Sequence, residues 1–343
     1  MSLPLVILCV VAAALVGGFL YQSIGASRDR RRYTGLGRWI DIARGHRLFV
    51  VEKGSGAPTV LFEAGIAATN LNWRHIQERV ARFTSTASYD RSGLGWSSPC
   101  RTVRTPGNIT AELHAMLQSA GIKPPYILVG HSFGGLVMRR YAVTYPAEVA
   151  GVVLIDPMRC EEWPPLNPAK QSMINRGKRL SRYAIPIARV GLARLAVTLL
   201  LFRSKSLSGQ DGGGDGSGAR HVLRRVTEEV GKMPRELWPV VAAHWSRPAY
   251  YTGMRRHVEA VPATVREMQG LDPIREIPVL VLTPGKSTPL SNECLGKIGN
   301  NVQQVIATAS AHWIHLDEPQ LVVDSIREMV LARTAAAPIP VTV

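Results

Sequence analysis

The chain has 343 residues, of which 46% are hydrophobic and 19% are charged. This mixture excludes a disordered chain, a collagen and a protein made only of membrane spans. The formal net charge of +16 suggests an anionic partner, either nucleic acid or a membrane surface. Residues 28–53 hold eight basic and three acidic residues, and residues 159–256 hold 18 basic and seven acidic residues. The positive charge is therefore concentrated in two blocks rather than spread over the whole protein.

The cysteines indicate neither a metal site nor a disulfide framework. The four cysteines, at positions 9, 100, 160 and 294, include no CxxC pair and no spacing typical of metal ligands. Cys9 lies in an apolar run, which leaves an odd number of cysteines elsewhere. We therefore expect no disulfide framework.

The N-terminal residues predict a helix that crosses a membrane. Leu3–Tyr21 contains no charged residue over 19 positions, and a helix of about 20 residues spans the hydrocarbon core of a bilayer. Tyr21 stands where an interfacial aromatic residue would, and four arginines follow it between residues 28 and 32. We therefore expect residues 1–32 to form a membrane segment with a basic flank.

Two other interpretations of this segment fit less well. A cleaved signal peptide normally begins with positive charge, which Met1-Ser2 lacks. A buried core helix rarely stays free of polar residues for so long at a chain end. The positive-inside rule places the arginine-rich flank on the cytoplasmic side of the membrane. The sequence thus favours a single-pass membrane protein with its body in the cytoplasm.

From about Trp39 onward, short apolar runs alternate with helical patterns. Buried strands that alternate with helices indicate an α/β fold, with a mostly parallel, doubly wound sheet and helices on both faces. The expected strands are 47–52, 59–62, 86–89, 126–129, 149–155, 279–282 and 302–307. The expected helices are 71–83, 109–120, 136–145 and 321–331.

One helix-rich interval breaks this alternation. It contains the run SLSGQDGGGDGSG at residues 206–218, which cannot bury apolar surface and predicts a flexible loop. The strongly apolar residues 184–202 predict one amphipathic helix. This helix either packs over the core, lies on a lipid surface or lines a pocket for an acyl chain. We interpret residues 158–273 as an inserted helical cap. The sheet domain then consists of residues 33–157 and 274–333, followed by a tail at 334–343.

A serine motif lies between an apolar strand pattern and a helical pattern, in Gly130-His131-Ser132-Phe133-Gly134. A serine on a tight strand-to-helix turn needs glycines where the backbone is strained and crowded. Such a turn exposes the hydroxyl at the carboxyl edge of the sheet and aims a helix N-terminus at it. The motif in this context indicates that Ser132 is a nucleophile.

Here the chain resembles the α/β-hydrolase family, over residues 39–333 and more loosely in the cap. The matching segments are Glu63-Ala64-Gly65-Ile66, Asp90-Arg91-Ser92-Gly93-Leu94-Gly95-Trp96-Ser97, the motif around Ser132, and Ala311-His312-Trp313-Ile314-His315-Leu316-Asp317-Glu318-Pro319. The resemblance implies an α/β-hydrolase fold with Ser132 as the nucleophile and His312 as the base that removes its proton. His315 is the rival base, and His131 is interpreted as structural.

The carboxylate that orients the base is less clearly marked. In the family it often follows the seventh strand, where this chain has Thr288, and threonine cannot carry the charge. Asp156 ends the sixth strand at the carboxyl edge of the sheet, where catalytic residues gather. We therefore assign the acid to Asp156. The alternatives are that Asp156 only caps the entrance to the helical cap, and that Glu293 is the acid.

The oxyanion hole is placed by position in the family pattern. It would consist of the backbone N–H groups of Phe133, which follows the nucleophile, and Ile66. The family often has His-Gly where this chain has Ala64-Gly65, so Ile66 is carried over on position alone.

These residues predict a membrane-anchored serine hydrolase that cleaves carboxylic esters, lipid esters among them, through an acyl-enzyme. No metal and no organic cofactor are implied, and scattered basic residues without a recognition motif disfavour nucleic-acid binding. An acyltransferase or perhydrolase on the same scaffold is one alternative, and a non-catalytic membrane-tethered binding protein is another. Epoxide and haloalkane hydrolysis are disfavoured because those relatives have Asp where this chain has Ser132. The sequence leaves the oligomeric state open.

Overall fold

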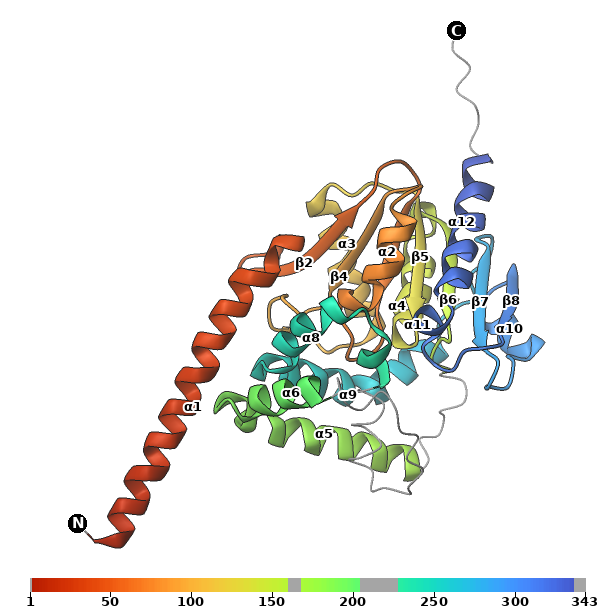
Figure 1. The fold of residues 1–343 in the computed structure, drawn as a ribbon. Coiled ribbons are helices and arrows are strands. Elements are labelled where there is room, and N and C mark those ends of the chain that lie inside the picture. The colour runs from red at the N-terminus through yellow and green to blue at the C-terminus, as the bar shows by residue number, and fades with distance from the viewer. Residues whose placement is uncertain (1, 160–167, 204–227, 336–343) are drawn as a thin grey trace.

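The computed structural model describes residues 2–159, 168–203 and 228–335 (Figure 1). Its strands are β1 Arg38–Ala43, β2 His46–Lys53, β3 Thr59–Glu63, β4 Thr86–Asp90, β5 Tyr126–His131, β6 Val149–Ile155, β7 Val279–Pro284 and β8 Val302–Ala307. Its α-helices are α1 Leu3–Tyr33, α2 Arg74–Val80, α3 Pro106–Ala120, α4 Phe133–Thr144, α5 Pro168–Arg189, α6 Leu192–Arg203, α8 Trp238–Trp245, α9 Pro248–Gln269, α10 Asn292–Ile298, α11 Ile314–Asp317 and α12 Pro319–Ala335. The glycine- and serine-rich run at 206–218, expected to be a loop, lies outside the described residues.

The eight strands form one sheet in the order β1-β2-β4-β3-β5-β6-β7-β8. From β4 to β8 every neighbouring pair is parallel, whereas β2 pairs antiparallel with both β1 and β4. This arrangement confirms the predicted, mostly parallel α/β-hydrolase sheet. Strand β1 was not expected from the sequence, because this edge strand buries only Ile40 fully and lacks the continuous apolar run of its neighbours.

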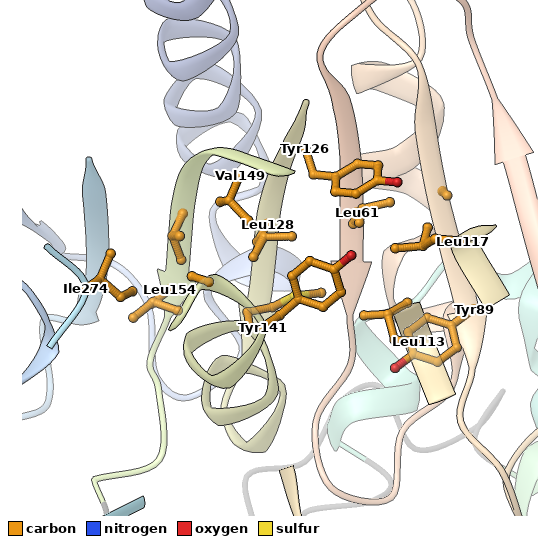
Figure 2. Close-up of a cluster of buried hydrophobic side chains, with 14 of the residues drawn as sticks. Leu61, Tyr89, Leu113, Leu117, Tyr126, Leu128, Tyr141, Val149, Leu154 and Ile274 are labelled. Carbon is orange, nitrogen blue, oxygen red and sulfur yellow. The ribbon is translucent and has the colours of Figure 1, made fainter. Parts of the chain in front are cut away.

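Helices cover both faces of the sheet, as predicted. On one face, α3 and α4 pack through side chains such as Leu117 and Tyr141 against Leu128 and Leu154 of the central strands (Figure 2). On the other face, α2 and α12 pack against the same strands through a second apolar cluster that contains Ile326. Because both faces of the sheet are buried, the sequences of its strands are nearly continuous apolar runs.

Helices α5, α6, α8 and α9 lie between β6 and β7 in the chain, in the interval that interrupts the alternation. The expected single helix at 184–202 is wrong, because the chain turns between α5 and α6. Gly191 stands at this turn with φ of 75°, a left-handed conformation that a continuous helix does not allow. The apolar composition of the segment concealed this break.

Helix α9 fixes these helices to the sheet domain by direct backbone contact. A Cβ atom at Gly253 would lie 2.1 Å from the carbonyl oxygen of Gly93, in the loop after β4. Arg247, just before α9, donates a hydrogen bond to the carbonyl of Gly95 in that loop, and its guanidinium lies 5.1 Å from the ring centre of Trp96. Only glycine permits so close an approach of two backbones.

We therefore predict that Gly253→Ala lowers the free energy of unfolding by about 2 to 3 kcal/mol, the usual cost of overpacking. The matched control is Gly270→Ala, which follows the same helix at φ of −93° and has no atom within 4 Å of the added carbon. Denaturant unfolding of both variants checks this. Superimposable curves for Gly253→Ala and the parent chain would rule out the close contact.

Helix α1 is, among the described residues, the one helix long and apolar enough to cross a membrane. None of its most apolar 18-residue window is buried, which does not fit a core helix. In Figure 1 its N-terminal half projects away from the rest of the protein. Only the C-terminal half of α1 lies against the protein body, where it ends close to β1.

Candidate active site

Ser132 occupies a strained turn between β5 and α4. Its backbone has φ of 54° and ψ of −119°, a conformation that costs non-glycine residues about 1 to 3 kcal/mol and persists only where the surroundings enforce it. Its N–H donates to the carbonyl of Ile155 (3.0 Å), and its carbonyl accepts from Gly135 (3.0 Å) and Met158 (3.2 Å). The turn thus places the hydroxyl at the carboxyl end of β5.

The glycines of the motif let the backbone close around this turn. A Cβ atom at Gly130 would lie 2.6 Å from the carbonyl oxygen of Gly134. A Cβ atom at Gly134 would lie 2.4 Å from the carbonyl oxygen of Glu63 at the end of β3. The sequence pattern therefore reflects contact between the helix N-terminus and the neighbouring strand.

His312 and Asp156 meet above the same edge of the sheet. His312 Nδ1 lies 2.6 Å from Asp156 Oδ2, although the two residues are 156 positions apart. Asp156 directly follows β6 and has φ of 39°, and its N–H donates to the carbonyl of Leu282 in β7 (2.8 Å). Both side chains are partly exposed. The pair is therefore accessible to a substrate and fixed by the sheet.

Two carboxylates hold the loop that carries His312. Glu318 Oε1 accepts hydrogen bonds from the N–H of Ala309 (3.0 Å) and from Ser310 Oγ (2.6 Å). Asp317 Oδ2 accepts from the N–H of Ala311 (3.3 Å), and Asp317 Oδ1 lies 2.6 Å from Nζ of Lys232, before α8. The acids that follow His312 in the sequence motif therefore bond to the residues just before it, at positions 309–311, whereas the His312 ring bonds to Asp156.

His131 joins the serine turn to the same loop. Its Nε2 lies 2.8 Å from the carbonyl oxygen of His312, and a carbonyl can only accept, so this nitrogen carries the proton. The rings of His131 and His312 are 4.7 Å apart between centres. Burial lowers the pKa of His131 well below its usual value. A neutral His131 thus fixes the backbone of His312 relative to Ser132, and sequence reasoning gave it no specific partner.

The rival base His315 is fully buried. Its ring lies 4.8 Å from that of Trp73 and 4.5 Å from that of His131. Neither ring nitrogen has a hydrogen-bond partner among the described residues, and burial lowers its pKa well below the usual value. His315 therefore forms no hydrogen bond to a carboxylate of the described residues, and its ring packs among the aromatic side chains of the core.

The two proposed oxyanion donors lie on segments in direct contact. Phe133 begins α4, and Ile66 follows β3 and packs against the cluster that contains Phe133. A Cβ atom at Gly65 would lie 3.9 Å from Cβ of Ser132, so the loop that carries Ile66 passes beside the nucleophile. The backbone amides after residues 65 and 132 therefore share one end of the sheet.

A buried ion pair supports this loop. Arg91 Nε lies 3.5 Å from Glu63 Oε1, with both side chains 1% exposed, and Tyr89 donates its hydroxyl proton to the same carboxylate. Arg91 also donates to the carbonyl of Gly65. Because the C=O and N–H of a trans peptide point in opposite directions, this bond turns the N–H of Ile66 away from Arg91. In the sequence the Asp90-Arg91 turn is marked only as a segment that matches the family.

The alternative acids lie apart from this cluster. Glu293 is on α10, and its carboxylate pairs with Lys297 at 3.0 Å while its side chain is 80% exposed. Thr288, in the family's usual acid position, is exposed, and its carbonyl accepts from Arg159. Of the candidates, the structure brings only Asp156 to His312. Among the described residues, no three His, Cys, Asp or Glu side chains converge to hold a metal ion.

Four buried histidines give the fold a sensitivity to acid. Burial lowers the pKa of His131, His257 and His315 well below the usual value, and that of His244 to about 3. Unfolding exposes them to water, where they bind protons below about pH 6.5. The unfolded state therefore binds more protons, and stability present above pH 6.5 is lost as the pH falls.

We predict that the free energy of unfolding decreases by about 1.4 kcal/mol per pH unit for each such histidine below pH 6.5. His244→Phe, in a ring site 4.7 Å from the Trp96 centre, should remove the contribution of one histidine between pH 6 and pH 4. Denaturant unfolding at stepped pH measures both slopes. A slope unchanged by His244→Phe would show that His244 is not neutral in the fold.

Comparison with known proteins agrees with this architecture. The model of the alpha/beta hydrolase family matches residues 60–325. The uncharacterized protein YqjL of Bacillus subtilis is 34% identical over 105 residues, which cover 31% of this chain and 42% of that protein. A second protein of that organism, YbdG, is matched over 44% of its length. The matched region thus spans less than half of the length of each of these two relatives.

Solved structures are similar over most of the chain. The epoxide hydrolase CorEH is 17% identical with a TM-score of 0.62, covering 86% of this chain and 98% of its own. Cfl2 from Burkholderia cenocepacia is 20% identical with a TM-score of 0.66, covering 86% and 95%. At these identities the likeness concerns the fold. The family match spans most of the sheet domain and includes the serine turn. The chain belongs to the alpha/beta hydrolase family.

Proposed function

We propose that this protein is a membrane-anchored serine hydrolase that cleaves carboxylic esters, with Ser132, His312 and Asp156 as its catalytic residues. The observation that carries the proposal is the 2.6 Å contact between His312 Nδ1 and Asp156 Oδ2, at the sheet edge where Ser132 occupies its strained turn. A carboxylate in this place fixes the imidazole tautomer that leaves Nε2 free to accept a proton.

The proposed reaction uses each group in turn. Ser132 Oγ attacks the ester carbonyl and passes its proton to Nε2 of His312, while Asp156 stabilises the imidazolium through Nδ1–H. The N–H groups of Phe133 and Ile66 donate to the oxyanion. Collapse of the tetrahedral intermediate releases the alcohol, which takes the proton from His312. Water, activated by the same histidine, then attacks the acyl-enzyme and releases the acid.

In the described residues Ser132 Oγ forms no hydrogen bond to His312, so this contact has to form when substrate binds. Catalytic hydrogen bonds are often long in free enzymes and shorten in the substrate complex. The His131 bond to the His312 carbonyl holds the loop of His312 beside the serine turn, where this contact has to form.

Helix α1 is the proposed anchor, because it is uncharged from Leu3 to Tyr21 and exposed in the folded chain. Washing membranes with alkaline carbonate should leave the full-length chain in the membrane fraction. The intact mass of that chain should include residues 3–32. Release into the wash, or a mature chain that begins after Tyr21, would show instead a removed signal sequence.

The enzymatic proposal is tested on the full-length protein in detergent, with p-nitrophenyl esters of graded acyl length. We expect turnover that stops after treatment with a fluorophosphonate. Product analysis in the presence of a competing alcohol separates hydrolysis from acyl transfer.

The absence of turnover across the series, together with no fluorophosphonate adduct, would favour the non-catalytic binding protein. Epoxide opening stays disfavoured, because Ser132 stands where those enzymes have a carboxylate.

A further inference from the structure

We propose that the outer face of α5 and α6 lies on an anionic lipid surface, the surface of the bilayer that α1 crosses. This proposal rests on the membrane anchoring proposed above and extends it to the catalytic body. The face is formed by six exposed apolar side chains, Leu180, Tyr183, Ile187, Leu192, Leu195 and Leu199, together with the arginines beside them on α5.

The first step is that α1 is held against the turn between α5 and α6. A Cβ atom at Gly18 would lie 2.3 Å from the carbonyl oxygen of Val190, so the two backbones touch. Arg194 of α6 donates to Gln22 (3.0 Å) and pairs with Asp29 (2.8 Å), both on α1. The position of α1 relative to this turn is therefore fixed by polar contacts and close packing.

The second step concerns how far the apolar surface of α1 extends. Past Gly18, Phe19 is 56% exposed and Ile24 is 50% exposed. Ile24 lies six positions after Gly18, and six positions advance a helix by about 9 Å. A bilayer that covers these side chains therefore extends about 9 Å past the level at which α1 meets Val190. The α5–α6 turn then lies at the membrane interface.

The third step is the pattern on α5. Leu180, Tyr183 and Ile187 follow at intervals of three and four residues, which places them on one exposed stripe of the helix. Arg179, Arg182 and other arginines form a neighbouring exposed stripe. On the opposite side, Ile174, Ser181 and Ala188 are buried, and α5 packs there against α9. An apolar stripe beside a basic one is typical of helices that lie in a membrane interface.

Helix α6 also combines exposed apolar side chains with basic residues, and the rest of the described protein body has few exposed large apolar side chains. Leu192, Leu195 and Leu199 are each about half exposed at helical spacing. Residues 168–203 contain eight basic residues and no acidic residue. Within the described part of the chain, all but five of the exposed large apolar side chains belong to α1, α5 or α6. Figure 1 shows α5 running across the direction of α1, on the side of the body toward the N-terminus.

Charge decides between lipid and a protein partner. Anionic lipid headgroups attract basic residues near the surface, each by about 1 kcal/mol, whereas the apolar side chains enter the acyl boundary. Both features occur on one face that adjoins α1. The arrangement therefore fits an anionic bilayer, and a second protein is an outcome that the experiment distinguishes.

The experiment uses the full-length protein in vesicles of phosphatidylcholine and phosphatidylglycerol that contain a photoactivatable phosphatidylglycerol. After illumination, lipid adducts are mapped by peptide mass spectrometry. We expect adducts on α1 and also on residues 168–203, with none on the exposed face of α12. Adducts confined to α1 would overturn the proposal and leave the anchor intact. The absence of adducts on α1 would instead overturn the anchoring itself.

Charge reversal provides the second arm. Arg179→Glu combined with Arg182→Glu should lower the adduct yield on residues 168–203 by about fivefold or more, with the yield on α1 unchanged. The matched control combines Arg82→Glu and Lys123→Glu, exposed residues that precede β4 and β5 at the opposite edge of the sheet. Equal yields from both double variants would contradict an anionic lipid surface. An equal yield in phosphatidylcholine vesicles that carry a photoactivatable phosphatidylcholine as the probe would contradict it as well.

Discussion

Replacing Ser132 by alanine is expected to lower kcat for ester hydrolysis by about 10⁴-fold or more. The hydroxyl is the atom that forms the acyl-enzyme, and no other group of the site can replace it. The oxyanion donors and His312 would remain, so residual turnover by water attack and substrate binding should persist. Steady-state kinetics with a p-nitrophenyl ester measures the loss, and an unchanged unfolding curve shows that the fold is intact.

The control for this variant is Ser287→Ala, an exposed serine in the loop after β7 at the same sheet edge. This variant should keep the activity of the parent chain. A Ser132→Ala protein that retains more than a few per cent of the parent kcat would mean that another group is the nucleophile. The turn at φ of 54° would then be a structural feature without the chemistry assigned to it.

The second large effect is expected for Asp156→Asn, which should lower kcat by about 10³- to 10⁴-fold with little change in KM. The asparagine amide can donate a hydrogen bond to Nδ1 of His312. That bond favours the tautomer protonated at Nε2, which cannot accept the proton of Ser132. The loss therefore reflects a wrong proton position, because asparagine is nearly isosteric with aspartate and disturbs the packing little.

Glu293→Gln is the matched comparison, since Glu293 was the alternative acid. Its carboxylate pairs with Lys297 on the exposed side of α10, so kcat should stay within about twofold of the parent value, as for surface substitutions. If Glu293→Gln loses as much activity as Asp156→Asn, or if Asp156→Asn is fully active, the assignment of the acid is wrong. Both variants are measured with the same ester and at the same pH.

Much of the fold could be predicted from the sequence because its signals are local. The parallel strands are buried on both faces and appear as apolar runs, and the serine motif identifies the turn after β5. The edge strand β1 has only one fully buried residue, so its pattern is weak. The break at Gly191 was hidden, because a single glycine in an apolar stretch does not by itself end a helix.

The site was less predictable, because its contacts join distant parts of the chain. Sequence order left Asp156 and Glu293 both open as the acid, and only the three-dimensional arrangement places one of them 2.6 Å from His312. Two further contacts of the site involve backbone atoms. His131 donates a hydrogen bond to the His312 carbonyl, and Arg91 donates one to the Gly65 carbonyl. Backbone partners leave almost no trace in a single sequence.

The covalent intermediate provides the most direct test of the account. The full-length protein is treated with a fluorophosphonate, digested and examined by tandem mass spectrometry to locate the adduct. The proposed chemistry predicts one adduct, on Ser132, and a labelling rate that falls strongly in His312→Ala. An adduct on a different residue, or ester turnover by a protein that forms no adduct at Ser132, would contradict it.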